Sequence, residues 1–324
     1  MTSLYITIDT EYSSGHFANR GKEARKENFL RSIAGRTPDG EAGIFYQMDM
    51  LERHGLKAVF FVDPMAALVW GVEAVADIVG PITARGHDVQ LHVHCEWLAF
   101  AGAENPVPGR TGRDIKNFTL DEQCTLLDYA RGVLVAAGAS PPVAFRAGNY
   151  GANDDTLRAL SSIGMRFDSS HCPGIAESDC AISLGPNDRE PVSCCGVIEV
   201  PVGCIAGPWG RLRHFQLTAI SGAEIIAALR HASRLNEPAM TLVSHSFELL
   251  SRDRLRINKV VKRRFERVCS ALQAMHDVET ATYTSRPPQA VTAGPGCRPL
   301  PHNPLRTAWR YAEQALSNTL YGEH

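Results

Sequence analysis

Short clusters of acidic, basic and histidine residues follow apolar runs at four places in the chain. The clusters are Asp9-Thr10-Glu11 after LYITI, His92-Val93-His94 after HDVQL, Arg146 after PVAF and His245 after MTLVS. An apolar run that ends in such residues is typical of a parallel strand, and in parallel α/β folds the chemistry collects at the carboxyl ends of the strands. The pattern predicts a metal-dependent hydrolase.

The first cluster is a pair of carboxylates. Asp9 and Glu11 are two residues apart at a strand end, so both side chains face the same side. Two acids at the end of an apolar strand need a cation or hydrogen-bond donors if they are buried. The alternative is that they begin a solvated loop.

The histidine pair has the same spacing. Two imidazoles and one carboxylate form an open zinc set that leaves the fourth position for water. The H-x-H pattern is weak by itself, and it gains weight from the D-x-E pattern at another strand end. We therefore expect His92 and His94 to bind a divalent metal, with Zn²⁺ as the first candidate. His87 precedes the strand and is expected to be structural.

Arg146 and His245 end two further strands. A strand-end arginine near carboxylates can hold an aspartate ionised and oriented. A histidine at the end of TLVSH could give a proton to a leaving group. The alternatives are an ordinary surface ion pair for Arg146 and a hydrogen-bonded core residue for His245.

The composition is that of a soluble globular protein. Hydrophobic residues make up 44% and charged residues 21%, and the formal net charge of −2 gives no reason to expect nucleic acid. There is no apolar run long enough for a membrane span and no basic-then-apolar N-terminal segment, so we expect a cytoplasmic protein. The nine cysteines are scattered, with one adjacent pair and no C-x-x-C, which favours reduced thiols.

Apolar runs alternate with segments of helical spacing along most of the chain. The expected strands are 4–8, 58–62, 89–92, 143–146, 165–168, 197–200, 241–244 and 279–283. The expected helices are 43–54, 72–85, 120–137, 154–163, 222–234, 256–275 and 305–320. The helix from 154 follows Asn153, which can cap its free amides.

This alternation predicts an α/β fold, an irregular (β/α) barrel with seven or eight parallel strands. We expect the barrel to cover residues 1–285. The remainder, 286–324, is expected to be a strap rich in Pro and Gly followed by a C-terminal helix, which could dock on the barrel or on a second subunit.

The clusters carry a family resemblance over roughly residues 3–285. ITIDTE, GHDVQLHVHCEW, FRAGNYG, FDSS around Asp168, and LVSH resemble, in order, the five motifs of the polysaccharide deacetylase superfamily, the carbohydrate esterases that remove N-acetyl groups from sugars. The family pattern has adjacent aspartates, and Thr10 stands in the second place here. It also puts its second histidine where this chain has Glu96. The resemblance is therefore to a variant with D-x-E and H-x-H motifs.

The resemblance implies a mechanism. Glu11, His92 and His94 would hold the metal, although Asp9 or Glu96 could supply the carboxylate instead. Asp9 would be the base, oriented by Arg146, and His245 the general acid. The resemblance also implies that Asp168 supports His245, and that a backbone amide near 149–150 helps to bind the oxyanion.

The implied substrate is an acetamido sugar or glycan, in surface-polysaccharide or glycoconjugate biosynthesis. The alternatives are hydrolysis of another small amide or formamide at the same site, and a catalytically silent sugar-binding homologue. The segment 12–40 is rich in cations: Arg20, Lys22, Arg25, Lys26, Arg31 and Arg36. It could cover an anionic, nucleotide- or lipid-linked sugar, or simply be a solvated face.

Overall fold

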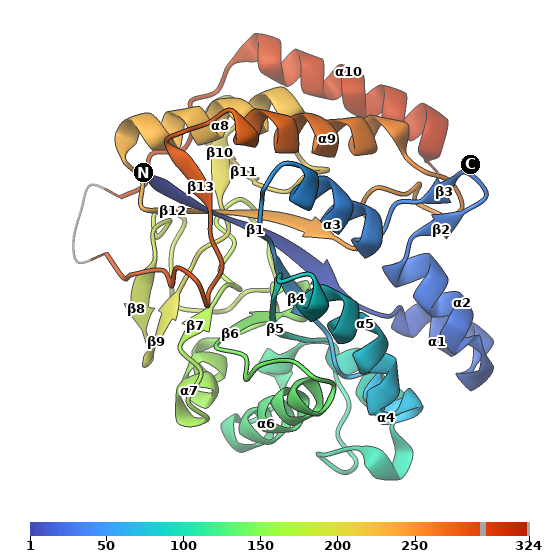
Figure 1. Cartoon of the computed structure of the whole chain (residues 1–324). Coiled ribbons are helices and arrows are strands. Elements are labelled where there is room, and N and C mark those ends of the chain that lie inside the picture. The colour runs from blue at the N-terminus through green and yellow to red at the C-terminus, as the bar shows by residue number, and fades with distance from the viewer. Residues whose placement is uncertain (292–295, 323–324) are drawn as a thin grey trace.

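A curled sheet of parallel strands forms the centre of the molecule, with helices packed around it (Figure 1). The computed structural model describes residues 1–291 and 296–322. In sheet order the strands are β12 (Ala239–His245), β1 (Thr2–Thr10), β4 (Val59–Val62), β5 (Asp88–Val93), β6 (Ala144–Ala147), β7 (Phe167–Asp168), β9 (Val197–Glu199) and β8 (Val192–Cys194).

All neighbours in this order are parallel except β8, which pairs antiparallel with β9 at one edge. A further short strand, β13 (Val278–Thr280), pairs parallel with the beginning of β1. The irregular (β/α) barrel expected from the sequence is confirmed.

The segment between β9 and β12 nearly closes the barrel. It contains the antiparallel hairpin of β10 (Cys204–Ala206) and β11 (Leu212–His214). The amide of Gly203 donates to the Thr241 carbonyl (3.0 Å), and Phe215 and Leu217 exchange backbone bonds with Val243. These bonds place the hairpin segment against β12, at the opposite end of the sheet order from β9.

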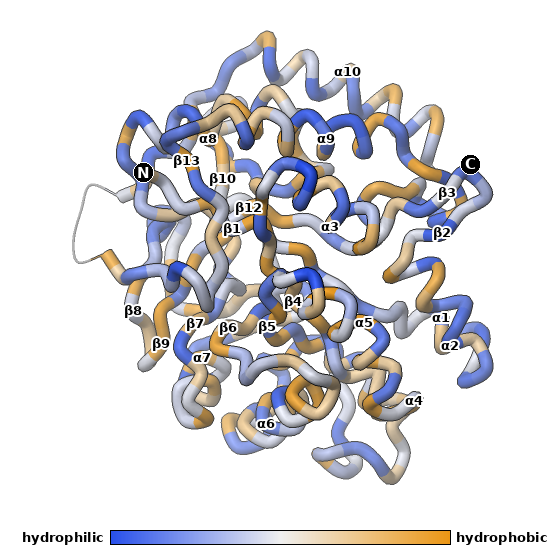
Figure 2. The backbone as a smooth tube through the Cα atoms, in the orientation of Figure 1, coloured by the Kyte–Doolittle hydropathy of each residue, from blue (hydrophilic) through white to orange (hydrophobic). Residues whose placement is uncertain are grey.

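The long helices cover the outside of the sheet. They are α3 (Ile44–Arg53), α5 (Val72–Ala84), α6 (Leu120–Ala136), α7 (Asp154–Ser162), α8 (Gly222–Leu235) and α9 (Lys259–Gln273). In Figure 1, α8 and α9 lie above β12 and β1, and α5, α6 and α7 lie below. Figure 2 shows hydrophobic residues gathered around β4, β5 and β6, whereas α9 presents a hydrophilic stretch. The expected cap of α7 is present, because the Asn153 side chain accepts from the Thr156 amide (3.0 Å).

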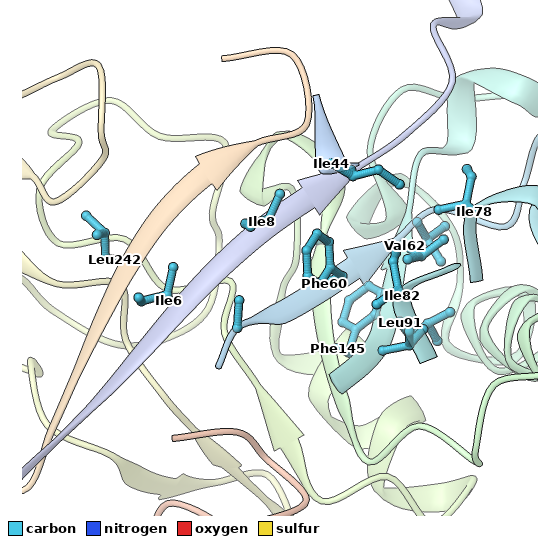
Figure 3. Close-up of a cluster of buried hydrophobic side chains, with 14 of the residues drawn as sticks. Ile6, Ile8, Ile44, Phe60, Val62, Ile78, Ile82, Leu91, Phe145 and Leu242 are labelled. Atoms are coloured by element: carbon cyan, nitrogen blue, oxygen red, sulfur yellow. The ribbon is translucent and has the colours of Figure 1, made fainter. Parts of the chain in front are cut away.

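Alternate residues of each strand face opposite sides of the sheet. Ile6 and Ile8 of β1 lie with Phe60 of β4 in the layer under the helices, where Figure 3 also shows Ile44 of α3 and Ile82 of α5. The other face of the same strands lines the barrel interior, with Tyr5, Val59, Phe61 and Tyr283 packed together. The odd-numbered residues of β1 therefore point inwards, and Asp9 is one of them.

The cation-rich segment 12–40, which follows β1, is partly helical. It contains α1 (Ser14–Arg20), α2 (Arg25–Asn28) and a single π-helical turn (Phe29–Ile33). Three of its cations form ion pairs: Arg25 with Asp77, Arg31 with Glu27, and Arg36 with Glu41. Half of the positive charge on this segment is thus neutralised within the chain.

The expected C-terminal helix is α10 (Pro304–Tyr321), which packs on α9. Before it, the Ala206 amide donates to the Leu300 carbonyl (2.9 Å), so the strap contacts the β10–β11 hairpin. The division into a barrel of 1–285 and a tail of 286–324 stays a prediction. All nine cysteines are free thiols. Among the described residues, no helix combines the length and apolar character needed to cross a membrane.

Candidate functional site

Glu11, His92 and His94 converge at the carboxyl ends of β1 and β5. The Oε2 atom of Glu11 lies 2.5 Å from Nε2 of His94 and 3.4 Å from Nε2 of His92. Their ligand atoms all lie within 4.8 Å of one another, close enough to share one metal ion. The i, i+2 spacing of each pair accounts for this, because His92 and His94 face the barrel interior from β5 as Asp9 and Glu11 do from β1.

Both imidazole rings are held in place through Nδ1, the ring nitrogen that faces away from Glu11. Nδ1 of His92 donates to the Arg146 carbonyl (2.7 Å), and Nδ1 of His94 donates to Oε2 of Glu96 (3.2 Å). This leaves both Nε2 atoms unprotonated in the neutral tautomer and aimed at Glu11. Glu96 lies on the far side of the His94 ring from Glu11, so it orients that histidine.

The electrostatics of Glu11 suit a cation site. Burial raises its pKa, but the adjacent histidines, His94 above all, outweigh burial and hold it well below its ordinary range. Burial lowers the pKa of His94, but Glu11 outweighs it and holds the pKa well above its usual value. Oε2 of Glu11 is buried without a hydrogen-bond partner among the described residues. A buried carboxylate oxygen and two imidazole nitrogens form a donor set that fits a divalent metal such as zinc.

Asp9 and Arg146 form a buried ion pair beside this cluster. Nη1 of Arg146 donates to Oδ1 of Asp9 (2.6 Å) and to Oγ1 of Thr7 (2.9 Å). The remaining guanidinium nitrogens donate to the carbonyl and hydroxyl oxygens of Ser169, both at 3.1 Å, and the group lies over the Phe61 ring. Arg146 is fully buried, so its orientation and that of Asp9 are fixed by the barrel interior.

His245 lies next to Asp9, because the two residues are register partners on the neighbouring strands β12 and β1. Its Nδ1 atom lies 3.6 Å from Oε2 of Glu248, and the same oxygen accepts the His245 amide (2.9 Å). Burial lowers the pKa of His245, but Glu248, Asp9 and Glu11 together raise it to about 9. At neutral pH His245 is therefore protonated and positively charged.

The family resemblance implies that Asp168 supports His245, but the structure shows other partners for this carboxylate. Across residues 1–291 and 296–322 it makes no hydrogen bond or ion pair with His245. It instead accepts from the amide and hydroxyl of Ser170 (3.0 and 2.8 Å), and it is the register partner of Glu199. Burial raises the pKa of both carboxyls, and the charge of Asp168 raises that of Glu199 further. The carboxylate that supports His245 is Glu248.

Three other supporting residues were missed in the sequence. Asp63, at the end of β4, accepts from the indole of Trp97 (3.1 Å) and the Met65 amide (3.0 Å), and burial raises its pKa to about 6. Asn149 donates to Glu96 (3.2 Å). Gly148 leaves room for His94, because a Cβ there would lie 2.8 Å from its Nδ1 and Cε1 atoms. The signal for Gly148 was its place in FRAGNYG, two residues after Arg146.

The loop after Arg146 holds two residues in the left-handed backbone region, Asn149 (φ 56°) and Tyr150 (φ 57°). The Tyr150 hydroxyl lies 3.1 Å from Nε2 of His214. Burial, which is the largest influence, holds the pKa of Tyr150 well above its ordinary value. The Tyr150 hydroxyl is therefore uncharged at neutral pH.

Solved structures provide the comparison, since no family model and no curated protein matches the chain. A Mycobacterium smegmatis protein described as a polysaccharide deacetylase is 15% identical, with a TM-score of 0.55 over 90% of this chain and 94% of that one. A 4-alpha-glucanotransferase from Thermococcus litoralis is 12% identical, with a TM-score of 0.51 over 87% of this chain and 39% of that one. A family 4 carbohydrate esterase from Streptomyces lividans, in complex with acetate, is 11% identical, with a TM-score of 0.46 over 90% of this chain and 98% of that one.

At these identities the likeness concerns architecture. The Mycobacterium smegmatis structure is matched over nearly the whole of both chains, and the glucanotransferase over little more than a third of its own length. The chain has the (β/α) barrel fold of the polysaccharide deacetylases.

Proposed function

We propose that this protein is a metal-dependent hydrolase that removes an N-acetyl or related N-acyl group from a sugar, in surface-polysaccharide or glycoconjugate biosynthesis. The observation that carries the proposal is the convergence of Glu11, His92 and His94 beside an oriented Asp9 and a charged His245. The fold alone does not choose this chemistry, because a glucanotransferase shares it. The side chains at the strand ends support it.

The metal would be held by Glu11, His92 and His94. A divalent ion such as zinc, when bound, polarises an amide carbonyl and lowers the pKa of a water molecule. The chain contributes the preset orientation of the ligands: the Arg146 carbonyl holds the His92 ring, and Glu96 holds the His94 ring. Such outer partners fix the tautomer and raise the basicity of a ligating histidine.

Asp9 is proposed as the base that takes a proton from the attacking water. Its carboxylate is held at 2.6 Å by the Arg146 guanidinium, which cannot rotate because Thr7 and Ser169 take its other hydrogen bonds. A base fixed within the barrel loses no orientational entropy when the substrate arrives. Arg146 acts by positioning Asp9.

His245 is proposed as the acid that protonates the departing amine. It lies on the strand next to Asp9, so an amide between the two would have a proton acceptor on one side and a donor on the other. The Tyr150 backbone N–H is the proposed donor to the developing oxyanion, because it has no acceptor among the described residues.

The experiment is elemental analysis of purified protein, wild type and His92→Ala, together with acetate release from N-acetylated sugars. We expect about one zinc or similar ion per wild-type chain and none in the variant, because a site of three residues no longer holds the ion when one of its ligands is removed. Asp9→Asn should keep the metal and lose turnover. Metal-free wild-type protein after zinc addition, or full activity of Asp9→Asn, would overturn the proposal.

A further inference from the structure

An arginine lies at the edge of the site in the turn that follows β12. Arg254 is partly buried, and its backbone is in the left-handed region (φ 59°). For a residue other than glycine this conformation is sterically unfavourable, and such strain persists mostly at functional positions. The direction of the Arg254 side chain is therefore set by an unfavourable backbone conformation of the turn.

Two contacts fix the guanidinium group. It lies over the Phe247 ring, 3.7 Å from the ring centre, and its Nη1 atom donates to the hydroxyl of Ser32 (2.8 Å). Ser32 is buried and donates in turn to Oδ1 of Asn28 (2.9 Å), which also accepts the Ser13 amide (2.9 Å). Arg254 is thus tied to the segment that immediately follows Glu11.

The group lies close to the reacting side chains. The Phe247 ring that supports it is 5.3 Å from the His245 ring, centre to centre. Burial lowers the pKa of Arg254, and the charge that opposes this effect is Glu11. Arg254 therefore lies within electrostatic range of the proposed ligand Glu11, and a single aromatic ring separates it from the proposed acid His245.

Within residues 1–291 and 296–322, Arg254 forms no ion pair, whereas the cations of the 12–40 segment at Arg25, Arg31 and Arg36 do. Glu11 is directed at His92 and His94. A partly buried charge is costly unless it is paired, and a guanidinium group offers a planar fork that matches carboxylate and phosphate oxygens.

We propose that Arg254 binds an anionic group, a carboxylate or a phosphate, carried by the acylamino substrate. The inference rests on the proposed function and adds the substrate class to it: an acetamido sugar that is itself acidic or that bears a phosphate. The anion lies against the Phe247 face of the site, with the acetamido group directed at Asp9 and His245.

The experiment is calorimetric binding of three sugars to the zinc-loaded protein at one ionic strength. The probes are N-acetylglucosamine, N-acetylglucosamine 6-phosphate and N-acetylmuramic acid, which supply no anion, a phosphate and a carboxylate. A hydrogen bond to a charged group contributes about 1.5–3 kcal/mol, so wild type should bind at least one anionic sugar about tenfold to a hundredfold more tightly. The two anionic probes separate the carboxylate from the phosphate source.

The variants decide whether Arg254 is responsible. Arg254→Met should remove the preference, and Arg254→Gly, which suits the left-handed backbone, removes the side chain without adding strain. The matched control is Arg256→Met. Arg256 is two residues from Arg254, is exposed and lies over the Tyr321 ring, so this change removes the same charge outside the proposed site. It should keep the preference.

Two results would overturn the proposal: equal affinities of wild type for all three sugars, or an anion preference that survives in both Arg254 variants. Acetate release is measured separately on the same samples. Absence of turnover with every sugar would count against the hydrolase, while the binding comparison would still decide the role of Arg254.

Discussion

Replacing Glu248 by glutamine should change the pH dependence of the reaction more than its maximum. Glu248 lies 3.6 Å from Nδ1 of His245 and is the first of the charges that raise the histidine pKa to about 9. Gln216 and Thr218 donate to its other oxygen, so an amide of the same shape keeps part of this network. The substitution removes the charge and leaves the volume unchanged.

The size of the effect follows from the pKa. In wild type, with a pKa of about 9, roughly nine-tenths of His245 is protonated at pH 8. Without Glu248, burial favours the neutral imidazole, and at an ordinary pKa of about 6.5 only about 3% is protonated at that pH. A reaction that needs His245 as an acid should therefore lose up to about thirtyfold at pH 8 and little at pH 6.

The assay is the pH profile of acetate release by the zinc-loaded enzyme, with the His245 imidazole titrated by NMR in the same samples. The alkaline limb should move down by up to about 2.5 pH units in Glu248→Gln, as the NMR titration does. Glu279→Gln, the same change at an exposed site, is the control and should keep the wild-type profile. If the NMR titration moves and the alkaline limb does not, His245 is not the acid.

Two further predictions concern the metal site and the stability of the barrel. Gly148→Ala places a Cβ 2.8 Å from Nδ1 and Cε1 of His94, so the zinc affinity measured by chelator competition should fall at least about tenfold. The control is Gly132→Ala, where a Cβ meets nothing within 4 Å. Equal zinc affinities of the two variants would mean that His94 is not a ligand. His87 is buried, and its pKa is lowered from the ordinary value to about 4, chiefly by burial. Because the unfolded chain binds the proton more readily, the free energy of unfolding should fall by up to about 3 kcal/mol as the pH drops from about 6.5 through 4. In His87→Asn, denaturant unfolding should lack this part of the slope, whereas His276→Asn at an exposed site should keep it; a wild-type slope in His87→Asn would contradict the reasoning.

The parts of the site that depend on local periodicity were predictable from the sequence. The two-residue spacing of Asp9 and Glu11, and of His92 and His94, requires a common face in any strand. Parallel strands then bring their carboxyl ends to one edge, which is enough to expect Arg146 and His245 nearby. The structure places all of these side chains at that edge.

The parts that depend on which strands are neighbours were not predictable in this way. Asp168 ends a strand as His245 does, but β7 is separated from β12 by β1, β4, β5 and β6. The supporting carboxylate is Glu248, three residues from His245 in the same turn. The helices between Ser14 and Ile33 were also missed, because helices of four to seven residues are too short to show a periodic pattern of apolar residues.

The position of β1 in the sheet has a consequence for biosynthesis. Within this barrel, β1 is made before the other strands and lies between β4 and β12, and its partner Ala239–His245 is made more than two hundred residues later. Until then one edge of a nine-residue strand that is buried in the folded protein lacks its hydrogen-bonding partner, and such edges are templates for pairing with other chains. The nascent barrel therefore depends on completion of its C-terminal third, and chains that end before β12 are expected to aggregate.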